Sequence, residues 1–427
     1  MTLDASALAR PRLPFHPFRT PDAASLGLLE GVRVVEYGSM VTAPFASKLL
    51  ADLGAEVIKV EDMGGDESRR QGPFPGDEPD PEKSGLFIYL NSNKHSVTLN
   101  LDTPSGRDLL HALVREADIF IENAPPGVME RRGLTHESLS AGNPRLIVTC
   151  IRPFGLSGPY RDYLGNDLVT WHAAALGHRY LGEPDREPLR TGGLYGSYYN
   201  GVNAAAATML AYHSRKETGE GQLVEISEAD CLSVTVMGYG LVALFYERGQ
   251  HLSRQGGSQR GGVPAAMMRC KDGYVFIFAS EAHMWEGLVH AMGDPEWAQA
   301  EIFKGHYRDR VRYGPEIYAM MQEWLDRTGR EEIFISCQRN RVPSTAVYTM
   351  DQSLNSVHLR GRGYFQRMEQ PGVGVIEAPG SPYVLGHKGT GAPRPAPALG
   401  EHNEEVLCGR VGVSRQELTE LRRSGVV

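Results

Sequence analysis

The residues from 190 to 222 carry the side chains with the clearest chemical potential in the chain. Gly192, Gly193 and Gly196 precede Ser197, and a loop rich in glycine lets the backbone come close to a ligand. A serine hydroxyl can attack a carbonyl carbon when a base lies beside it. It can also cap the helix that the following alanines predict, or bind a thioester or carboxylate through a hydrogen bond. All three uses of Ser197 stay open at this point.

A carboxylate lies 30 residues upstream, at Asp167 in the run Gly165-Asn-Asp. An aspartate after glycine and asparagine is typical of a turn or a helix cap. It can also support a binding pocket, or act as a nucleophile in covalent catalysis. The residues alone leave these three roles open.

The segments around these residues predict an α/β fold. Residues 32–37 and 55–61 are typical of strands, and residues 43–54 of a helix with leucines on one face. Strand, helix and strand in this order form a βαβ unit, which implies a parallel sheet. Further strands are predicted at residues 97–101, 118–123, 144–150 and 223–226. The alternation predicts a doubly wound parallel-sheet domain. No GxGxxG motif follows the first strand, so no dinucleotide is expected.

The composition changes from about residue 245. Residues 268–277 predict a strand pair broken by Asp-Gly, and residues 284–292 and 316–326 predict helices. This part reads as a smaller α+β domain, and the Gly- and Pro-rich residues 355–400 as a return linker. We therefore expect four parts, namely a flexible N-terminal extension (1–27), a large domain (28–230), a linker helix with the small domain (231–350), and a return linker with a C-terminal segment that completes the large domain (351–427).

The bulk properties exclude several classes of protein. The 427 residues carry a net charge of −8 without a Lys/Arg-rich block, so nucleic acid is not an expected partner. No apolar run reaches the length of a membrane span, and residues 1–27 lack the apolar core of a signal peptide. The five cysteines are widely spaced, which predicts reduced thiols in the cytoplasm and no metal site.

Several motifs together resemble the family III CoA-transferases, the group of formyl-CoA transferase and carnitine CoA-transferase. The resemblance covers the chain from about residue 28 to its end, in the order in which the family carries these motifs. The matching stretches are residues 28–61 with Gly65-Asp66, the turn at residues 91–96, the loop at residues 190–201, and residues 399–407. The resemblance implies ring-shaped subunits in an interlocked dimer.

The family usually has Gly-Asp-x-x-x-Gly where this chain has Gly196-Ser197-Tyr-Tyr-Asn-Gly201. In the family, that aspartate attacks the donor thioester and then carries CoA on its own carbonyl carbon. Ser197 cannot carry CoA because a hydroxyl has no carbonyl carbon. The resemblance therefore implies a subunit that exchanges CoA between an acyl-CoA such as succinyl-CoA and an organic acid, with a homologous partner subunit that bears the aspartate.

The absence of the family's nucleophile leaves other functions open. A non-catalytic CoA-binding homodimer, or a CoA-ester lyase or isomerase using Asp167, would also fit a chain without the family's nucleophile. The racemases of the same fold need acid/base groups at two positions that are Asn166 and Ser197 here. Neither group suits proton transfer near neutral pH, which argues against a racemase.

The resemblance also implies a set of CoA-binding residues. Arg131 matches a position that reaches the CoA phosphates, and a guanidinium suits phosphate. Asn123 and Val128 flank the same turn, and Leu99 matches an adenine contact. Lys94 belongs to a family turn, and Gly261 and Gly262 remain from a loop that covers the acyl group. A structural role is open for Leu99 and Lys94. Asp62 and Asp102 stand where basic residues are common. No metal and no permanent cofactor are expected.

Overall fold

The structure is a computed structural model that describes residues 27–427 except 238–241, 251–252, 255–261, 306 and 384–392. The predicted N-terminal extension therefore lies almost entirely outside the described residues. The chain divides into two compact units. Of the described residues, the first unit holds those within 27–164, 197–228 and 363–427, and the second holds those within 165–196 and 229–362. Residues 165–196, which the sequence placed with the large domain, group with the second unit.

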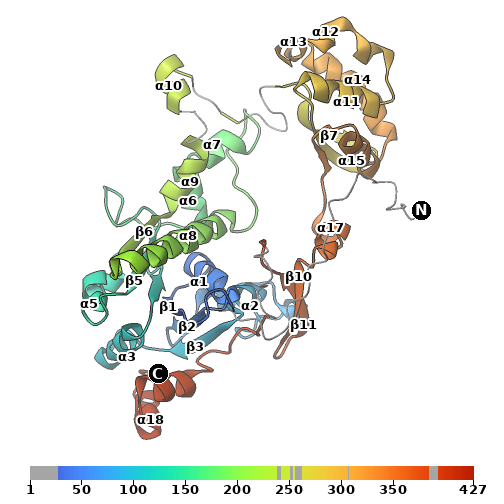
Figure 1. The fold of residues 1–427 in the computed structure, drawn as a ribbon. Coiled ribbons are helices and arrows are strands. Elements are labelled where there is room, and N and C mark those ends of the chain that lie inside the picture. Colours follow the sequence, from blue (N-terminus) through green and yellow to red (C-terminus); the bar gives the residue numbers. More distant parts are fainter. Residues whose placement is uncertain (1–26, 238–241, 251–252, 255–261, 306, 384–392) are drawn as a thin grey trace. The chain divides into compact units, whose positions relative to one another are not determined.

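The first unit is built on a six-stranded sheet (Figure 1). All five strand pairs in this sheet are parallel, as the βαβ pattern predicts. The strand order is β3-β2-β1-β4-β5-β6, so the order reverses between β1 and β4. The strands are β1 (Arg33–Tyr37), β2 (Glu56–Glu61), β3 (Lys94–Thr98), β4 (Ile119–Glu122), β5 (Ile147–Arg152) and β6 (Leu223–Ser227).

The prediction for β3 was wrong by three residues at each end. The sequence predicted a turn through residue 96 and a strand over 97–101, but β3 begins at Lys94, which pairs with Val57 of β2. Lys94 and His95 look like turn residues because charged side chains are rare inside a sheet. Lys94 is nevertheless buried, because its ammonium group pairs with Glu36 of β1.

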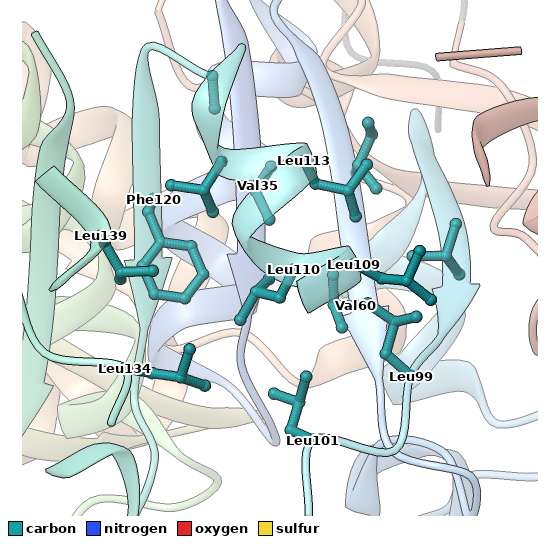
Figure 2. Packing of buried hydrophobic residues seen from close by; sticks show 14 of the residues in the cluster. Val35, Val60, Leu99, Leu101, Leu109, Leu110, Leu113, Phe120, Leu134 and Leu139 are labelled. Carbon is teal, nitrogen blue, oxygen red and sulfur yellow. The ribbon is translucent and has the colours of Figure 1, made fainter. Parts of the chain in front are cut away.

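One face of the sheet packs against an apolar core (Figure 2). Helix α3 (Pro104–Arg115) supplies Leu109, Leu110 and Leu113 to it, and the sheet supplies residues such as Val35 and Phe120. Figure 2 shows these side chains meeting between α3 and the strands. Two short helices, α4 (Val128–Arg131) and α5 (His136–Ala141), follow β4 and add Met129 and Leu139 to the same core.

The other face carries α1 (Thr42–Asp52), which contacts α2 (Gly85–Asn91), and α8 (Tyr195–Thr218). Helix α8 comes close to its neighbours through small residues. A Cβ on Gly201 would lie 2.9 Å from the carbonyl oxygen of Thr42. Ala204 and Thr208 are fully buried, and the hydroxyls of Thr208 and Thr149 in β5 are 2.7 Å apart. The small side chains of Ala204 and Thr208 thus let this helix lie close to the sheet.

The C-terminal segment completes the first unit. A π-helix, η6 (Glu404–Val411), and α18 (Arg415–Arg423) return Val406, Leu407 and Leu418 to the core on the α3 side. Just before η6, His402 Nδ1 accepts a hydrogen bond from Ser96 N, and Asn403 Oδ1 accepts one from Thr98 N. These two side chains thus accept hydrogen bonds from backbone N–H groups on the outer edge of β3.

The predicted return linker contains a hairpin that the sequence analysis missed. β10 (Phe365–Gln370) and β11 (Gly374–Pro379) pair antiparallel in the first unit. The first unit also has two 3₁₀ segments, η2 (Glu67–Arg70) and η3 (Pro75–Asp77).

The second unit contains a three-stranded antiparallel sheet and helices, as predicted for the smaller domain. Its strands are β7 (Ala265–Cys270), β8 (Gly273–Phe278) and β9 (Ser344–Ala346). Its core includes Trp285, Ile317 and Leu325. The helices are α6 (Asp167–Ala173), α7 (Leu176–Tyr180), α9 (Glu228–Val236), α10 (Val242–Arg248), α11 (Ala282–Ala291), η5 (Glu296–Gln299), α12 (Glu301–Lys304), α13 (Tyr307–Val311), α14 (Gly314–Arg327), α15 (Arg330–Arg339), α16 (Met350–Leu354) and α17 (Val357–Gly361). In the described part of the chain, no helix combines the length and the apolar character needed to span a bilayer.

Candidate functional site

The reversal of strand order between β1 and β4 marks the first place to look for a ligand. Open α/β sheets bind ligands outside the carboxyl ends of their strands at such a switch point. Two turns flank it. Residues 38–41 join β1 to α1, and residues 123–127 join β4 to α4. The predicted CoA-binding residues Asn123, Val128 and Arg131 all lie in or directly after the second turn.

The amide of Asn123 links these two turns. Its Oδ1 accepts from Ser39 N at 2.9 Å, and its Nδ2 donates to Ser39 O at 2.9 Å and to Thr42 Oγ1 at 2.8 Å. Both N–H donors are therefore used within the protein. Asn123 lies where the sequence predicts a CoA contact, but its described bonds brace the turn after β1.

Arg131 is the exposed cation of this region. It ends α4, and its guanidinium lies against Gly127, where an added Cβ would be 2.9 Å from Nη1. Gly127 has φ of 75°, a conformation that suits glycine. Val128 is half-buried beside it. An exposed guanidinium next to a switch point is placed to meet an anion such as a phosphate.

The neighbouring Arg132, unlike the exposed Arg131, pairs with side chains of the protein. Its Nε lies 2.9 Å from Asp102 Oδ1, and its Nη1 donates to Tyr37 Oη at 2.7 Å. The Tyr37 hydroxyl donates in turn to Asp62. Burial and the Asp62 carboxylate raise the pKa of Tyr37 to about 12, although Arg132 opposes the rise. Asp62 and Asp102, which stand where the family often has basic residues, thus engage Arg132 directly or through Tyr37, whereas Arg131 is exposed.

Leu99 and Lys94 lie in the interior. Leu99 is fully buried in the core on the α3 side. The Lys94 Nζ donates to Glu36 Oε2 at 2.8 Å, to Pro44 O at 2.7 Å and to Asn91 Oδ1 at 2.9 Å, which uses all three of its protons. Burial lowers the pKa of Lys94 to about 8, with Glu36 opposing and Lys59 adding to the effect. These contacts favour the structural role left open for both residues.

Of the two predicted loop glycines, Gly261 lies outside the described residues. Gly262 is buried in the second unit, where an added Cβ would lie 2.4 Å from Ser280 Cβ. This close packing explains a glycine at residue 262. A contact of either glycine with an acyl group stays a prediction.

A buried ionic network lies beneath the turn after β1, and the sequence analysis missed it. Glu36 is fully buried, 2.7 Å from Lys59 Nζ and 2.8 Å from Lys94 Nζ. Lys59 Nζ also lies 2.8 Å from Asp66 Oδ2. Burial opposes the ionisation of Glu36 and Asp66, but the lysines outweigh it and hold the pKa of each carboxyl below its usual value. Charged residues inside two otherwise apolar strands, Glu36 in β1 and Lys59 in β2, were the available signal.

Ser197 is not a helix cap. Helix α8 begins at Tyr195, so Ser197 is its third residue, and the prediction of an N-cap at this position was wrong. Tyr195 and Gly196 already belong to the helix. Ser197 is half-buried in the first turn of α8. Its other predicted roles are unaffected by this correction.

Asp167 is the first residue of α6 in the second unit, and the cap of that helix is Asn166, whose Oδ1 accepts from Val169 N. The Asp167 carboxylate is buried, with Oδ2 3.6 Å from Arg190 Nη1. An added Cβ on Gly196 would lie 3.0 Å from Asp167 Oδ1. The cap position thus belongs to Asn166, and a supporting role of the buried Asp167 carboxylate stays a prediction.

Comparisons with known proteins agree with this arrangement of motifs. The sequence model of CoA-transferase family III matches residues 29–403. The chain belongs to CoA-transferase family III. The formyl-CoA:oxalate CoA-transferase of Streptomyces avermitilis is 30% identical over 93% of this chain and 99% of its own length. The succinyl-CoA–D-citramalate CoA-transferase of Chloroflexus aurantiacus is also 30% identical, over 93% of this chain and 98% of its own.

A solved structure of a CaiB/BaiF family protein from Brucella suis superposes with a TM-score of 0.78. It is 28% identical and covers 90% of this chain and 100% of its own length. A third sequence relative is named the beta subunit of the succinyl-CoA–L-malate CoA-transferase of Chloroflexus aurantiacus, at 30% identity over 93% of this chain and 98% of its own.

As a member of CoA-transferase family III, the chain takes CoA thioesters as substrates, and no permanent cofactor is indicated. The relatives act on different acids, among them oxalate and citramalate. Family membership therefore establishes the class of reaction and leaves the acid substrate open.

Proposed function

We propose that this chain is the subunit of a heteromeric CoA-transferase that lacks the nucleophilic carboxylate. Its partner would be a homologous subunit with an aspartate at the position of Ser197. Together they would move CoA between succinyl-CoA and an organic acid. The subunits would interlock as a dimer, as the family resemblance implies, and the widely spaced cysteines suit a location in the cytoplasm.

The observation that carries this proposal is Ser197 in the first turn of α8, where the family has its aspartate. Transfer of CoA between two acids passes through an acyl carbon on the enzyme, which a carboxylate provides and a hydroxyl does not. Support also comes from the relative whose name includes "beta subunit" and succinyl-CoA. The exposed Arg131 at the switch point supports retained binding of CoA by this chain.

A second candidate is a CoA-ester lyase or isomerase that uses Asp167. The observation in its favour is the buried Asp167 carboxylate, which lies beside Gly196 and near Arg190. In that case the chain would act without an aspartate-bearing partner.

The test is to purify the chain alone and together with a homologue that carries the aspartate. CoA exchange from succinyl-CoA is measured, and the enzyme-bound thioester is trapped with borohydride and located by mass spectrometry. We expect exchange only with the partner, and the trapped label on the partner's aspartate. Ser197→Ala in this chain should leave the exchange rate within about 2-fold, whereas removing the partner's nucleophile should lower it at least about 1,000-fold.

Other results would contradict the proposal. A label on Asp167 of this chain, lost in Asp167→Asn, would assign the nucleophile to this chain. Turnover of an acyl-CoA by the chain alone, without exchange into an acid, would favour the lyase or isomerase. Ser197→Asp is the matched gain-of-function variant, and a label on residue 197 there would show that the site still positions a nucleophile.

A further inference from the structure

The turn that follows β1 has an unusual backbone. Met40, in the middle of residues 38–41, has φ of 62°. Residues other than glycine rarely occupy this left-handed region, because Cβ crowds the following carbonyl. Such a conformation persists only where surrounding contacts determine it, and it often marks a functional site.

Buried side chains from other segments hold this turn. Asp66 Oδ1 accepts from Met40 N at 3.0 Å, and Lys59 Nζ donates to Gly38 O at 2.8 Å. Asn123 bonds both the N–H and the carbonyl of Ser39. Thus the backbone groups of three successive turn residues are bonded to side chains from β2, from the segment after β2, and from the end of β4.

The anchoring groups are themselves costly to bury. Lys59 is fully buried and Asp66 is 4% exposed, and both belong to the ionic network of Glu36 and Lys94. Removing ions from water carries a penalty that apolar residues of similar size would avoid. A network of this kind is therefore poor evidence for added stability. The hydrogen bonds of Asp66 and Lys59 to Met40 and Gly38 show that the network holds the turn after β1.

The location of the turn in the sheet points to a role in ligand binding. It lies at the switch point, on the β1 side, opposite Arg131 on the β4 side. We propose that Asn123 and Asp66 are positioning residues for the CoA thioester. They hold residues 38–41 in the strained conformation that fits the bound ligand, so that binding requires no rearrangement of the turn. This inference rests on the proposed function, because it requires that this chain binds CoA.

The same geometry distinguishes positioning from direct contact. Both N–H groups of Asn123 already donate to Ser39 O and Thr42 Oγ1. A ligand that took either proton would have to break a bond that holds the turn. Asn123 therefore acts on the ligand through Ser39 and Met40.

The experiment compares two asparagines that brace turns at opposite ends of the sheet. Asn143 precedes β5, and its amide also makes three hydrogen bonds, in this case all with backbone groups: Val114 O, Ala117 O and Arg145 N. Asn123→Ala, Asp66→Asn and Asn143→Ala are prepared in the full chain. CoA dissociation constants are measured by calorimetry well below each melting temperature. Hydrogen exchange by mass spectrometry reports on the peptide that contains residues 38–42.

We expect Asn123→Ala and Asp66→Asn to weaken CoA binding at least about 10-fold, because the turn must then be ordered by the ligand. Exchange of residues 38–42 should rise in both variants. Asn143→Ala should lower the melting temperature while its CoA affinity stays within about 2-fold. Adding Met40→Gly to Asn123→Ala should restore most of the affinity, since glycine adopts positive φ without crowding.

Equal CoA affinity of Asn123→Ala and Asn143→Ala, with wild-type binding intact, would overturn this inference and leave the proposed function standing. So would failure of Met40→Gly to restore affinity in a variant whose turn exchanges faster. If the wild-type chain fails to bind CoA both alone and with its aspartate-bearing partner, the proposed function is overturned and this inference with it.

Discussion

The two faces of the central sheet are built from different chemistry, and β1 shows both. Val35 points into the apolar core with α3, whereas Glu36, the next residue, pairs with Lys59 and Lys94 on the side of α1. Both side chains are almost fully buried. Successive residues of a strand face opposite sides, so a single strand can serve both environments.

The apolar face contributes mainly to stability, whereas the ionic face mainly positions a turn. Burial of the apolar face stabilises the fold in proportion to the area removed from water. The ionic face must first offset the desolvation of four charged groups, so its contribution to stability is small or absent. What it provides is a set of directed bonds to the turn after β1, at the edge of the sheet where ligands bind.

The largest effect is expected from breaking the ionic face. Glu36→Ala leaves the ammonium groups of Lys59 and Lys94 buried without their shared carboxylate. We expect a loss of about 3–5 kcal/mol in the free energy of unfolding, because an uncompensated buried charge is costly. Urea unfolding followed by circular dichroism measures it. A loss below about 1 kcal/mol would show that water reaches these lysines.

A somewhat smaller loss is expected on the apolar face. Leu110→Ala in α3 removes a fully buried side chain of the core and should cost about 3 kcal/mol in the same assay. Leu28→Ala is the matched control, since Leu28 is 49% exposed and its truncation should change stability by less than about 0.5 kcal/mol. Equal losses in the two variants would mean that the core around α3 relaxes to fill the space.

The smallest effect concerns pH and the edge strand β3. His95 stacks on His402 with ring centroids 4.5 Å apart. Burial, then the neighbouring His402 and Arg394, lower the pKa of His95, while Glu405 and Glu56 oppose the shift. A histidine with a lowered folded pKa contributes stability that is present above about pH 6.5 and is lost as pH falls below it.

Unfolding free energies measured from pH 7.5 to 5 should therefore decline more steeply for the wild type than for His95→Gln. The decline should be modest, because the side chain is only partly buried and solvent screens its charge. Parallel pH profiles for the two proteins would assign the acid sensitivity to other groups.

Much of the first unit could be predicted from the sequence. The strands at residues 33–37, 56–61 and 119–122 were found because short apolar runs alternate with helical segments. The hairpin of β7 and β8 was found from its Asp-Gly turn. These signals come from residues close together in the sequence. They predict the folded structure correctly where the buried side chains are apolar.

The errors occurred where distant residues decide the local structure. β3 begins at Lys94 because the carboxylate of Glu36, 58 residues away, pairs with the buried Lys94 ammonium group. The β10–β11 hairpin was hidden among Gly- and Pro-rich residues that resemble a linker. Asp66 appeared in the sequence only as part of a family motif, and its bond to Met40 depends on a turn conformation that no periodicity reveals.

The covering of β3 by His402 and Asn403 also has a consequence for how the chain is made. The bond between Ser96 and His402 joins residues 306 positions apart. A ribosome must therefore synthesise most of the protein before the outer amides of β3 find their partners. Until then an unpaired strand edge is available to other nascent chains, a recognised route to aggregation. Overproduction of this protein should benefit from chaperones that shield the edge until the last residues emerge.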